Sequence, residues 1–164
     1  MERLSINNTP LKQRLTLVIN YKYMATSQSI IYENSTFVPT VTLVGGAGNT
    51  TPVYSTNTGN YTKLQNKIFV DIFVNGDGGD EGAGTGVLNI AIPYASSASF
   101  PGGYFKCGYA VNGTTKYLIY GKINAGESTI ALRYFSSASA DADFTGAVQN
   151  NATRTIRLQF SYTV

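Results

Sequence analysis

The 164-residue sequence contains no histidine, no tryptophan and a single cysteine, Cys107. The absence of histidine removes the commonest general base and excludes a Ser-His-Asp triad. One cysteine without any histidine also excludes the ordinary zinc sites and an intrachain disulfide. The only catalysis that this composition permits uses carboxylates, as in glycoside hydrolysis. We therefore expect a protein that is not an enzyme and that carries no metal and no cofactor.

Charged residues are scarce as well, at 13 % of the chain, and the net charge is only +3. Residues 1–22 hold four basic residues against one acidic residue, while the other eight basic and eight acidic residues cancel. Nucleic-acid binding needs a dense basic surface, so nucleic acid is not an expected partner. No run of 18 apolar residues exists, and the first residues lack the apolar core of a signal peptide. A membrane is therefore not expected as a partner either.

The sequence is rich in glycine and tyrosine, with 17 and 12 residues, and its apolar residues alternate with a period of two. This pattern predicts β-strands with one buried face. The clearest strand is residues 155–164, whose apolar positions share one face: Ile156, Leu158, Phe160, Tyr162 and Val164. Cys107 lies in another alternating run, and we expect it to be a small buried residue.

Residues 67–74, KIFVDIFV, are apolar on both faces, which predicts a strand covered on both sides. Asp71 interrupts this strand, and we interpret it as a carboxylate paired with an arginine or lysine of a neighbouring strand. Turn signals separate the short strands, and Asn112–Gly113 is the best candidate for a tight turn. Pro39 marks an edge or a bulge. The sequence predicts an all-β sandwich, jelly roll or barrel without a convincing helix.

Residues 75–86, NGDGGDEGAGTG, contain six glycines and three acids, Asp77, Asp80 and Glu81. The spacing of the acids does not fit a calcium loop of the EF-hand type. No lysine follows the glycines as in a P-loop, and a strand rather than a helix comes next. We interpret the segment as a long hairpin tip that forms a surface-contact loop, with a loosely bound cation as the alternative.

Five tyrosines fall on adjacent predicted strands, and they are candidates for a ligand-binding or subunit-facing surface. They are Tyr104, Tyr109, Tyr117, Tyr120 and Tyr134. Tyrosines beside Asn and Ser could stack on sugar rings, but such residues more often fill a core or a subunit interface. Asp141 and Asp143 form an adjacent acidic pair, which we interpret as solvated residues rather than a catalytic pair.

The N-terminal residues 1–36 read as an arm and residues 37–164 as the domain. The basic residues of the arm are candidate anchoring residues: Arg3, Lys12, Arg14 and Lys22. Residues 14–22 alternate weakly and could form a strand, although the arm has little core of its own. An ordered terminus of this kind suggests docking on a neighbour. Met24 is a second plausible start of translation.

The segment 37–94 resembles the C-terminal domain of many tailed-bacteriophage virion proteins, which include tail fibres, head fibres and capsid decorations. The resemblance rests on an aromatic-x-Pro strand, a G-x-Y-x-K turn and a closing strand that ends in Pro and an aromatic residue. The matching residues are Phe37, Pro39, Gly59, Tyr61, Lys63, Gly86, Leu88, Ile90, Pro93 and Tyr94. These motifs reflect packing and turns, so they indicate fold more strongly than function.

The resemblance implies a jelly-roll β-sandwich, related to the tumour necrosis factor fold, that assembles as a homotrimer on the surface of a phage particle. It also implies that the glycine loop is a variable tip. We expect a structural protein of the virion, a capsid decoration (cement) or head-fibre protein, that binds a major capsid or tail protein through its arm. The alternative is the receptor-binding tip of a tail fibre that recognises host-surface carbohydrate. About 36 residues without heptads or fibre repeats precede the match, which favours the structural role.

Overall fold

The computed structural model describes residues 3–9, 12–19, 28–46, 54–77, 84–137, 140–149 and 153–164. The strands of these segments are β1 (Arg3–Thr9), β2 (Lys12–Ile19), β3 (Gln28–Phe37), β4 (Val41–Val44), β5 (Thr56–Leu64), β6 (Lys67–Asp77), β7 (Val87–Ala91), β8 (Tyr104–Asn112), β9 (Thr115–Lys122), β10 (Thr129–Ser137), β11 (Ala140–Asp143) and β12 (Thr153–Thr163). The only other regular element in the described part is a 3₁₀ turn, η1 (Gly146–Gln149). The protein is therefore all-β, as the alternation predicts.

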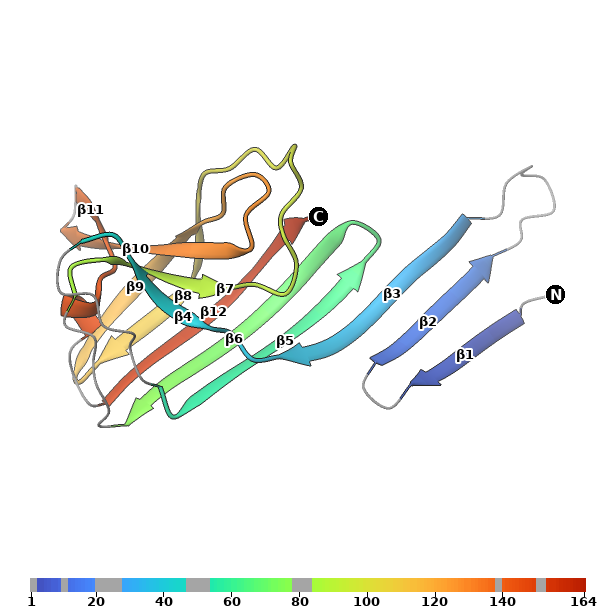
Figure 1. Ribbon diagram of the computed structural model, residues 1–164, viewed down its shortest axis with the longest axis horizontal. Coiled ribbons are helices and arrows are strands. Elements are labelled where there is room, and N and C mark those ends of the chain that lie inside the picture. Colours follow the sequence, from blue (N-terminus) through green and yellow to red (C-terminus); the bar gives the residue numbers. More distant parts are fainter. Residues whose placement is uncertain are drawn as a thin grey trace.

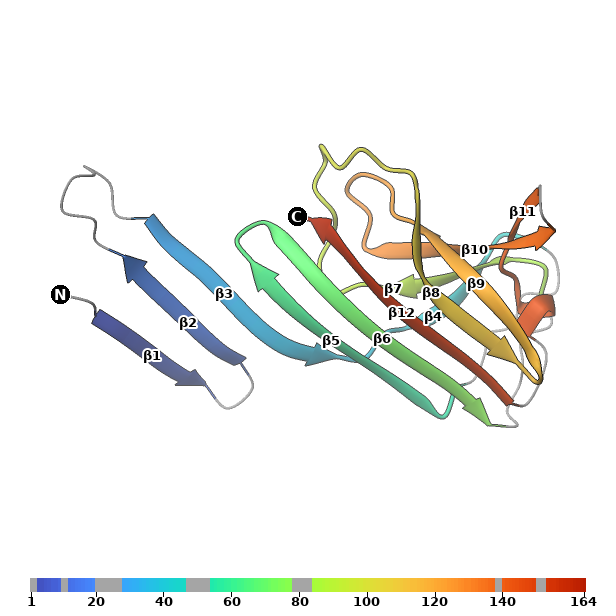
Figure 2. The same ribbon diagram turned by 180° about the vertical axis from the view of Figure 1, so that it is seen from behind.

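The strands form one antiparallel sheet in the order β1-β2-β3-β5-β6-β12-β8-β9-β10-β7-β4, and β11 pairs with β10 at its side. The sheet curls over at β9 and β10, so that β10, β7 and β4 become a second layer that crosses β6, β12 and β8 (Figure 1). This arrangement is consistent with a β-sandwich. Strands β1, β2 and β3 extend the sheet sideways, away from the second layer, in both views (Figures 1 and 2).

The core lies between the two layers. One side is built from β6 and β12, where Ile72 and Leu158 are fully buried, and the other from β7 and β10, where Ile90 and Leu132 are fully buried. These residues alternate with polar or exposed ones along each strand, because successive side chains of a strand point to opposite faces. Cys107 is buried in the same core, as expected.

Strand β6 is central, with β5 on one side and β12 on the other. Its Ile68, Val70, Ile72 and Val74 face the core, but the opposite face is not covered in the single chain, where Phe69 is 44 % exposed. The expectation of a strand covered on both sides is therefore wrong for the isolated protomer. We call the face that carries Phe69 the outer face.

Two hairpin turns differ from the sequence expectation. Asn112 pairs with Thr115, so the two-residue loop is Gly113–Thr114, one residue later than predicted. Gly113 has φ of +61°, which suits the first loop position of a type II′ turn. The expected G-x-Y-x-K turn is part of strand β5, and the chain turns after it at Gln65, with φ of +55°.

Pro39 lies in the break between β3 and β4, where the chain crosses from the outer part of the sheet to the second layer. Strand β4 pairs only with β7 among the described strands and so forms an edge, which agrees with the edge that Pro39 predicts. Within the described residues, no helix is long and apolar enough to cross a membrane.

Candidate functional site

The outer face is a continuous surface over β5, β6, β12, β8, β9 and β10. Cross-strand pairing carries it from one strand to the next, with Phe73 opposite Arg157, Arg157 opposite Tyr109 and Tyr109 opposite Leu118. Residues paired in this way lie on one face of a sheet. Its large exposed residues are Phe69, Tyr104, Tyr109, Leu118 and Phe135. This much exposed apolar surface on one face is typical of a binding or subunit interface.

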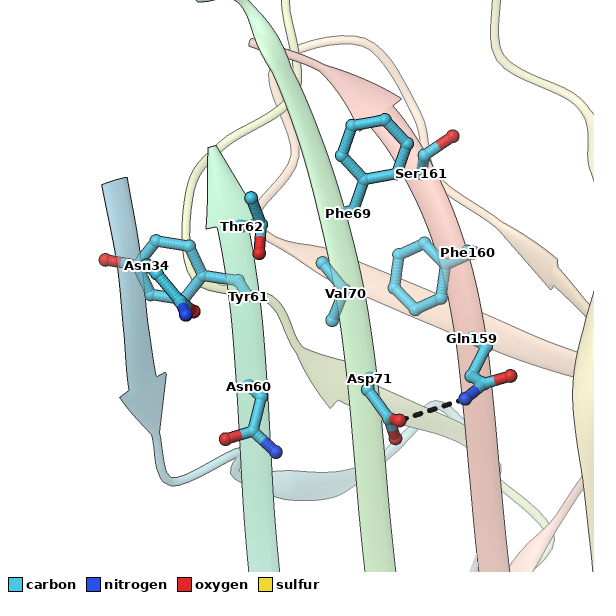
Figure 3. Close-up of a pocket in the computed structure, with 10 residues that line it drawn as sticks. All are labelled: Asn34, Asn60, Tyr61, Thr62, Phe69, Val70, Asp71, Gln159, Phe160 and Ser161. Carbon is cyan, nitrogen blue, oxygen red and sulfur yellow. Dashed lines mark hydrogen bonds between the residues drawn. The ribbon is translucent and has the colours of Figure 1, made fainter. Parts of the chain in front are cut away.

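A hollow of about 430 Å³ opens on this face above β5, β6 and β12 (Figure 3). Asp71 and Gln159 lie opposite each other in it, and the Gln159 amide donates a 2.9 Å hydrogen bond to the Asp71 carboxylate. Phe69 flanks the pair on one side and Asn60 on the other. A second hollow of about 170 Å³ shares Asp71 and Gln159 and is also lined by Tyr109 and Arg157.

Cations lie over several aromatic rings of the outer face. The Arg157 guanidinium is 4.7 Å from the centre of the Phe73 ring, and the Lys67 ammonium is 5.3 Å from that of Phe69. The Arg133 guanidinium lies 4.9 Å from the Tyr104 ring. Such contacts are worth about 0.5–1 kcal/mol each at exposed sites. These contacts place positive groups next to aromatic rings across the outer face.

The five candidate tyrosines divide between the two faces of the sheet. Tyr104 and Tyr109 are exposed on the outer face, and Tyr120 lies there edge-on to Phe135 at 4.8 Å. Tyr117 and Tyr134 face the core instead, where they contact each other edge-to-face at 5.1 Å and both pack on the buried ring of Phe144. Only the first three belong to the candidate site.

A second group of tyrosines, which the sequence does not reveal, joins β3 to the body. The Tyr61 hydroxyl donates a 2.6 Å hydrogen bond to Glu33 Oε1, and the Tyr94 hydroxyl bonds both oxygens of this carboxylate at 3.1 Å. Tyr162 donates to the Tyr94 carbonyl at 2.9 Å. We call these four residues the tyrosine–glutamate cluster.

Burial controls the protonation of this cluster. Burial, and then the hydrogen bond to the Glu33 carboxylate, hold the pKa of Tyr61 far above its usual value. Burial also raises the pKa of Tyr162 to about 12. A hydroxyl held neutral in this way acts as a hydrogen-bond donor and not as a base or nucleophile. The hydroxyls of Tyr61 and Tyr162 are therefore neutral donors in contacts that join β3 to the body.

Five of the ten residues that carry the resemblance in the sequence meet at this joint. Phe37 contacts the ring of Tyr61 edge-on at 6.2 Å, and the Tyr61 and Tyr94 rings are 5.5 Å apart. The Lys63 ammonium lies 4.5 Å from the centre of the Tyr94 ring. A Cβ at Gly59 would be 2.3 Å from the Phe37 ring, so only glycine fits there. The motif thus has a packing reason, which is why its spacing indicates fold.

Another buried polar group lies at the opposite end of β12. Arg154 is completely buried, and its guanidinium is 4.9 Å from the centre of the Tyr54 ring. The Tyr54 hydroxyl donates to Gln149 Oε1 at 3.3 Å. Burial raises the pKa of Tyr54 to about 12, although Arg154 acts in the other direction. Arg154 is in phase with the buried Ile156 and Leu158 along β12, whereas the exposed Arg157 is on the other face, so the alternation of the strand separates the two arginines.

Two acidic residues of interest, Asp71 and Asp143, each have a side-chain partner. Asp71 bonds Gln159 rather than the expected arginine or lysine. Asp143 lies in β11, not in a loop, and accepts a 2.7 Å hydrogen bond from Arg133. Asp141 is in the same strand. In the described part of the chain, no three acidic or cysteine residues lie close enough to hold a metal ion.

Three candidate residues of the loop and the arm lie outside the described part. Asp80, Glu81 and Lys22 are not described, and Asp77 ends strand β6. The surface-contact loop therefore stays a prediction. The other anchoring residues occupy strand positions, with Arg3 in β1 and both Lys12 and Arg14 in β2.

Comparison of the chain with known protein families, curated protein sequences and solved structures gave no significant match, so its function is inferred here from the outer face, the tyrosine–glutamate cluster and the arm.

Proposed function

We propose that this chain is a non-enzymatic structural protein of a bacteriophage particle, a trimeric capsid decoration or head-fibre protein. Its body is a jelly roll of the tumour-necrosis-factor type, and its N-terminal residues 1–36 attach it to a capsid or tail protein. The observation that carries this proposal is the outer face, on which Phe69, Tyr109, Leu118 and Phe135 are each more than 40 % exposed in the single chain.

The outer face suits contact with a copy of the same chain. It extends across six strands as an aromatic-rich surface, and Tyr, Phe and Arg are the residues enriched at the centres of protein interfaces. Arg157 and Arg133 already lie against aromatic rings, so burying them against a neighbour costs less than burying free cations. A threefold arrangement of this face would bury the exposed side of β6, which explains why that strand is apolar on both faces.

The tyrosine–glutamate cluster supports the resemblance to the phage domain. The residues of the motif, which are up to 57 positions apart between Phe37 and Tyr94, pack on one another at the joint between β3 and the body. A chain could satisfy the motif by chance without this packing. Because these motif residues pack together, the motif corresponds to one structural unit. This packing supports a shared fold with the phage domain more than it supports a shared function.

The oligomeric state is the first test. Sedimentation of the full chain at micromolar concentration should give three times the monomer mass. The variant Phe69→Lys should lower the mass to that of a monomer, since it adds a charge to the centre of the outer face. Ser99→Lys, at an exposed position off this face, should remain a trimer. A wild-type chain that sediments as a monomer would reject the trimer.

The location is the second test. Mass spectrometry of particles purified from cells that carry the gene should detect the protein in stoichiometric amounts. Removal of residues 2–9 should reduce its amount on the particles. Full occupancy by the shortened chain would show that the arm is not the anchor, and absence of the intact chain from purified particles would reject the virion role.

One observation favours a second function, the recognition of a host-surface carbohydrate. The two adjoining hollows place the Asp71–Gln159 pair between the rings of Phe69 and Tyr109. Sugars are bound by such combinations of ring faces with carboxylate and amide groups. The two functions require different states of the outer face. A trimer interface is buried, whereas a sugar site must stay exposed in the assembly. If Asp71→Asn abolishes binding of the particle to host cells and leaves the trimer intact, the second function is supported.

A further inference from the structure

The arm strands form an amphipathic three-stranded sheet. Cross-strand pairing aligns Leu4, Leu17 and Ile30 in one row. A second row aligns Ile6, Leu15, Tyr32 and Leu64. We call these two rows the leucine rows, and every residue in them is apolar. Residues paired across antiparallel strands belong to the same face of a sheet.

The rows that alternate with the leucine rows belong to the opposite face and are mostly polar. One aligns Asn7, Arg14, Glu33 and Lys63, and another aligns Ser5, Thr16 and Ile31. The first of these rows brings positive, negative and positive residues side by side. A third row on the face of the leucine rows, Asn8, Gln13 and Asn34, is polar. Along the two leucine rows the arm is therefore amphipathic, in the manner of a sheet that covers a core on one side.

The leucine rows are a continuation of the outer face. Glu33 and Lys63 reach the tyrosine–glutamate cluster on the core side, so their chain neighbours Tyr32 and Leu64 belong to the outer side. Tyr32 is 36 % exposed and Leu64 is 42 % exposed. The next row along the same face is Asn34, Thr62 and Phe69, which leads directly to the hollow above β6.

The described part of the chain provides no second layer for the arm. Strands β10, β7 and β4 cross the body only, and β1 and β2 lie beyond them in both views (Figures 1 and 2). A sheet with one apolar face needs a partner layer, because a single layer leaves that face in water. The partner of the leucine rows must itself be apolar and must be present wherever the protein is folded.

We propose that the partner is a second and a third copy of this chain, whose leucine rows meet around the threefold axis and form a shared core for the arms. This inference rests on the trimer of the proposed function and assigns the arm to its interface. Three amphipathic sheets around one axis bury all three apolar faces at once. The rows that face outward then carry Arg3, Lys12 and Arg14, which agrees with an anchor to the particle through the basic residues.

A copy of this chain fits better than an unrelated partner for two reasons. The leucine rows contain no charged residue from β1 to β5, and the first charge beyond them on this face is Lys67, which pairs with Leu64, so they offer little complementary charge to a foreign surface. They are also continuous with the face that the trimer uses in the body, so the same rotation axis covers both. The arm is thus bifunctional, with an inner side for assembly and an outer side for attachment.

Adjacent residues of β3 provide a matched test in the full chain. Tyr32 and Ile31 are equally exposed in the single chain, at 36 % and 38 %, but belong to opposite faces. Tyr32→Lys should raise the dissociation constant of the trimer at least ~100-fold, since three unpaired charges would meet near the axis. Ile31→Lys should leave it within about threefold, because residue 31 lies on the outward side near Glu33. Sedimentation equilibrium measures both.

A second matched pair tests the hairpin itself. Leu15→Lys should dissociate the trimer and Thr16→Lys should not, because these adjacent positions pair with Tyr32 and Ile31 respectively. Far-ultraviolet circular dichroism checks that each variant still folds. A wild-type monomer would overturn the trimer and this inference together. A wild-type trimer that Tyr32→Lys and Leu15→Lys leave intact would overturn the role of the arm alone, and equal dissociation by both members of a pair would overturn it as well.

Discussion

The hydroxyl of Tyr61 on β5 donates a 2.6 Å hydrogen bond to the carboxylate of Glu33 on β3, and Tyr94 bonds the same carboxylate from the end of the second layer. One acidic side chain therefore holds three parts of the molecule in place. Strand β3 connects the arm to the body, so the angle at which the arm leaves the body depends on this contact. If the arms meet around an axis, that angle has to be the same in every copy.

Replacing Tyr61 by phenylalanine should lower the free energy of unfolding by about 2 kcal/mol, because a hydrogen bond to a charged group is lost and Glu33 remains partly buried. Denaturant unfolding followed by tyrosine fluorescence measures the change. Tyr104→Phe is the control, since that ring is half exposed and the variant should differ by less than about 0.5 kcal/mol. A Tyr61→Phe variant as stable as the control would show that the cluster does not hold β3 to the body.

Gly59→Ala should destabilise the protein by about 1–3 kcal/mol, because the new Cβ would lie 2.3 Å from the ring of Phe37. The loss should be smaller when Phe37 is first changed to leucine, which leaves room for the methyl group. A double-mutant cycle on the two positions isolates this coupling. Additive losses would mean that glycine is needed at residue 59 for another reason than the approach of this ring.

Cys107 should not react with thiol reagents in the native protein. Its side chain is buried, and burial raises the pKa of the thiol to about 12, so very little thiolate forms near neutral pH. Labelling should become complete in denaturant, and the ratio of the two rates should exceed about 1,000 when unfolding is the only route to reaction. Rapid labelling of the native chain would indicate local opening of β8.

Alternation alone identifies most strands of the body, but not β5, where the sequence predicts a turn, and not the short β11. Ile156, Leu158 and Tyr162 are buried as residues of one face of β12, and the buried residues of β6 follow the same rule. Successive side chains of a strand point to opposite faces, so a period of two in the apolar residues shows which residues are buried. The position of the turn at Gly113 is less accurate, because Asn112 and Gly113 both suit a tight turn and pairing of β8 with β9 decides between them.

The candidate site is less predictable because it depends on register. Tyr104 and Tyr109 are five residues apart, and strict alternation would place them on opposite faces. A bulge between Lys106 and Gly108 shifts the register, so both lie on the outer face. Tyr117 and Tyr134 turn to the core through ordinary alternation. The pairing of Glu33 with Tyr61 is equally hidden, since nothing local relates a strand of the arm to the middle of β5.

The two buried tyrosines of the cluster should make the protein unstable in alkali. In the unfolded chain a tyrosine loses its proton near pH 10, whereas in the folded protein the pKa of Tyr162 is raised to about 12 and that of Tyr61 is raised even further. The folded state thus binds more protons above pH 10, and the free energy of unfolding falls as the pH rises. The contribution of these two tyrosines to stability should be constant below about pH 9. It should then fall by up to about 1.4 kcal/mol per pH unit for each of these tyrosines between pH 10 and pH 12.

Denaturant midpoints measured across that range, together with the ultraviolet absorbance of tyrosinate, check this prediction. Tyr162→Phe is the informative control, because it removes one of the groups whose pKa burial raises and leaves Tyr61, Tyr54 and Cys107 in place. The variant should be less stable at neutral pH, where the hydrogen bonds to Tyr94 are lost, and its stability should fall less steeply in alkali. If its stability falls as steeply as that of the wild type, Tyr162 does not titrate in the folded protein as its burial requires, and the alkaline transition originates elsewhere in the chain.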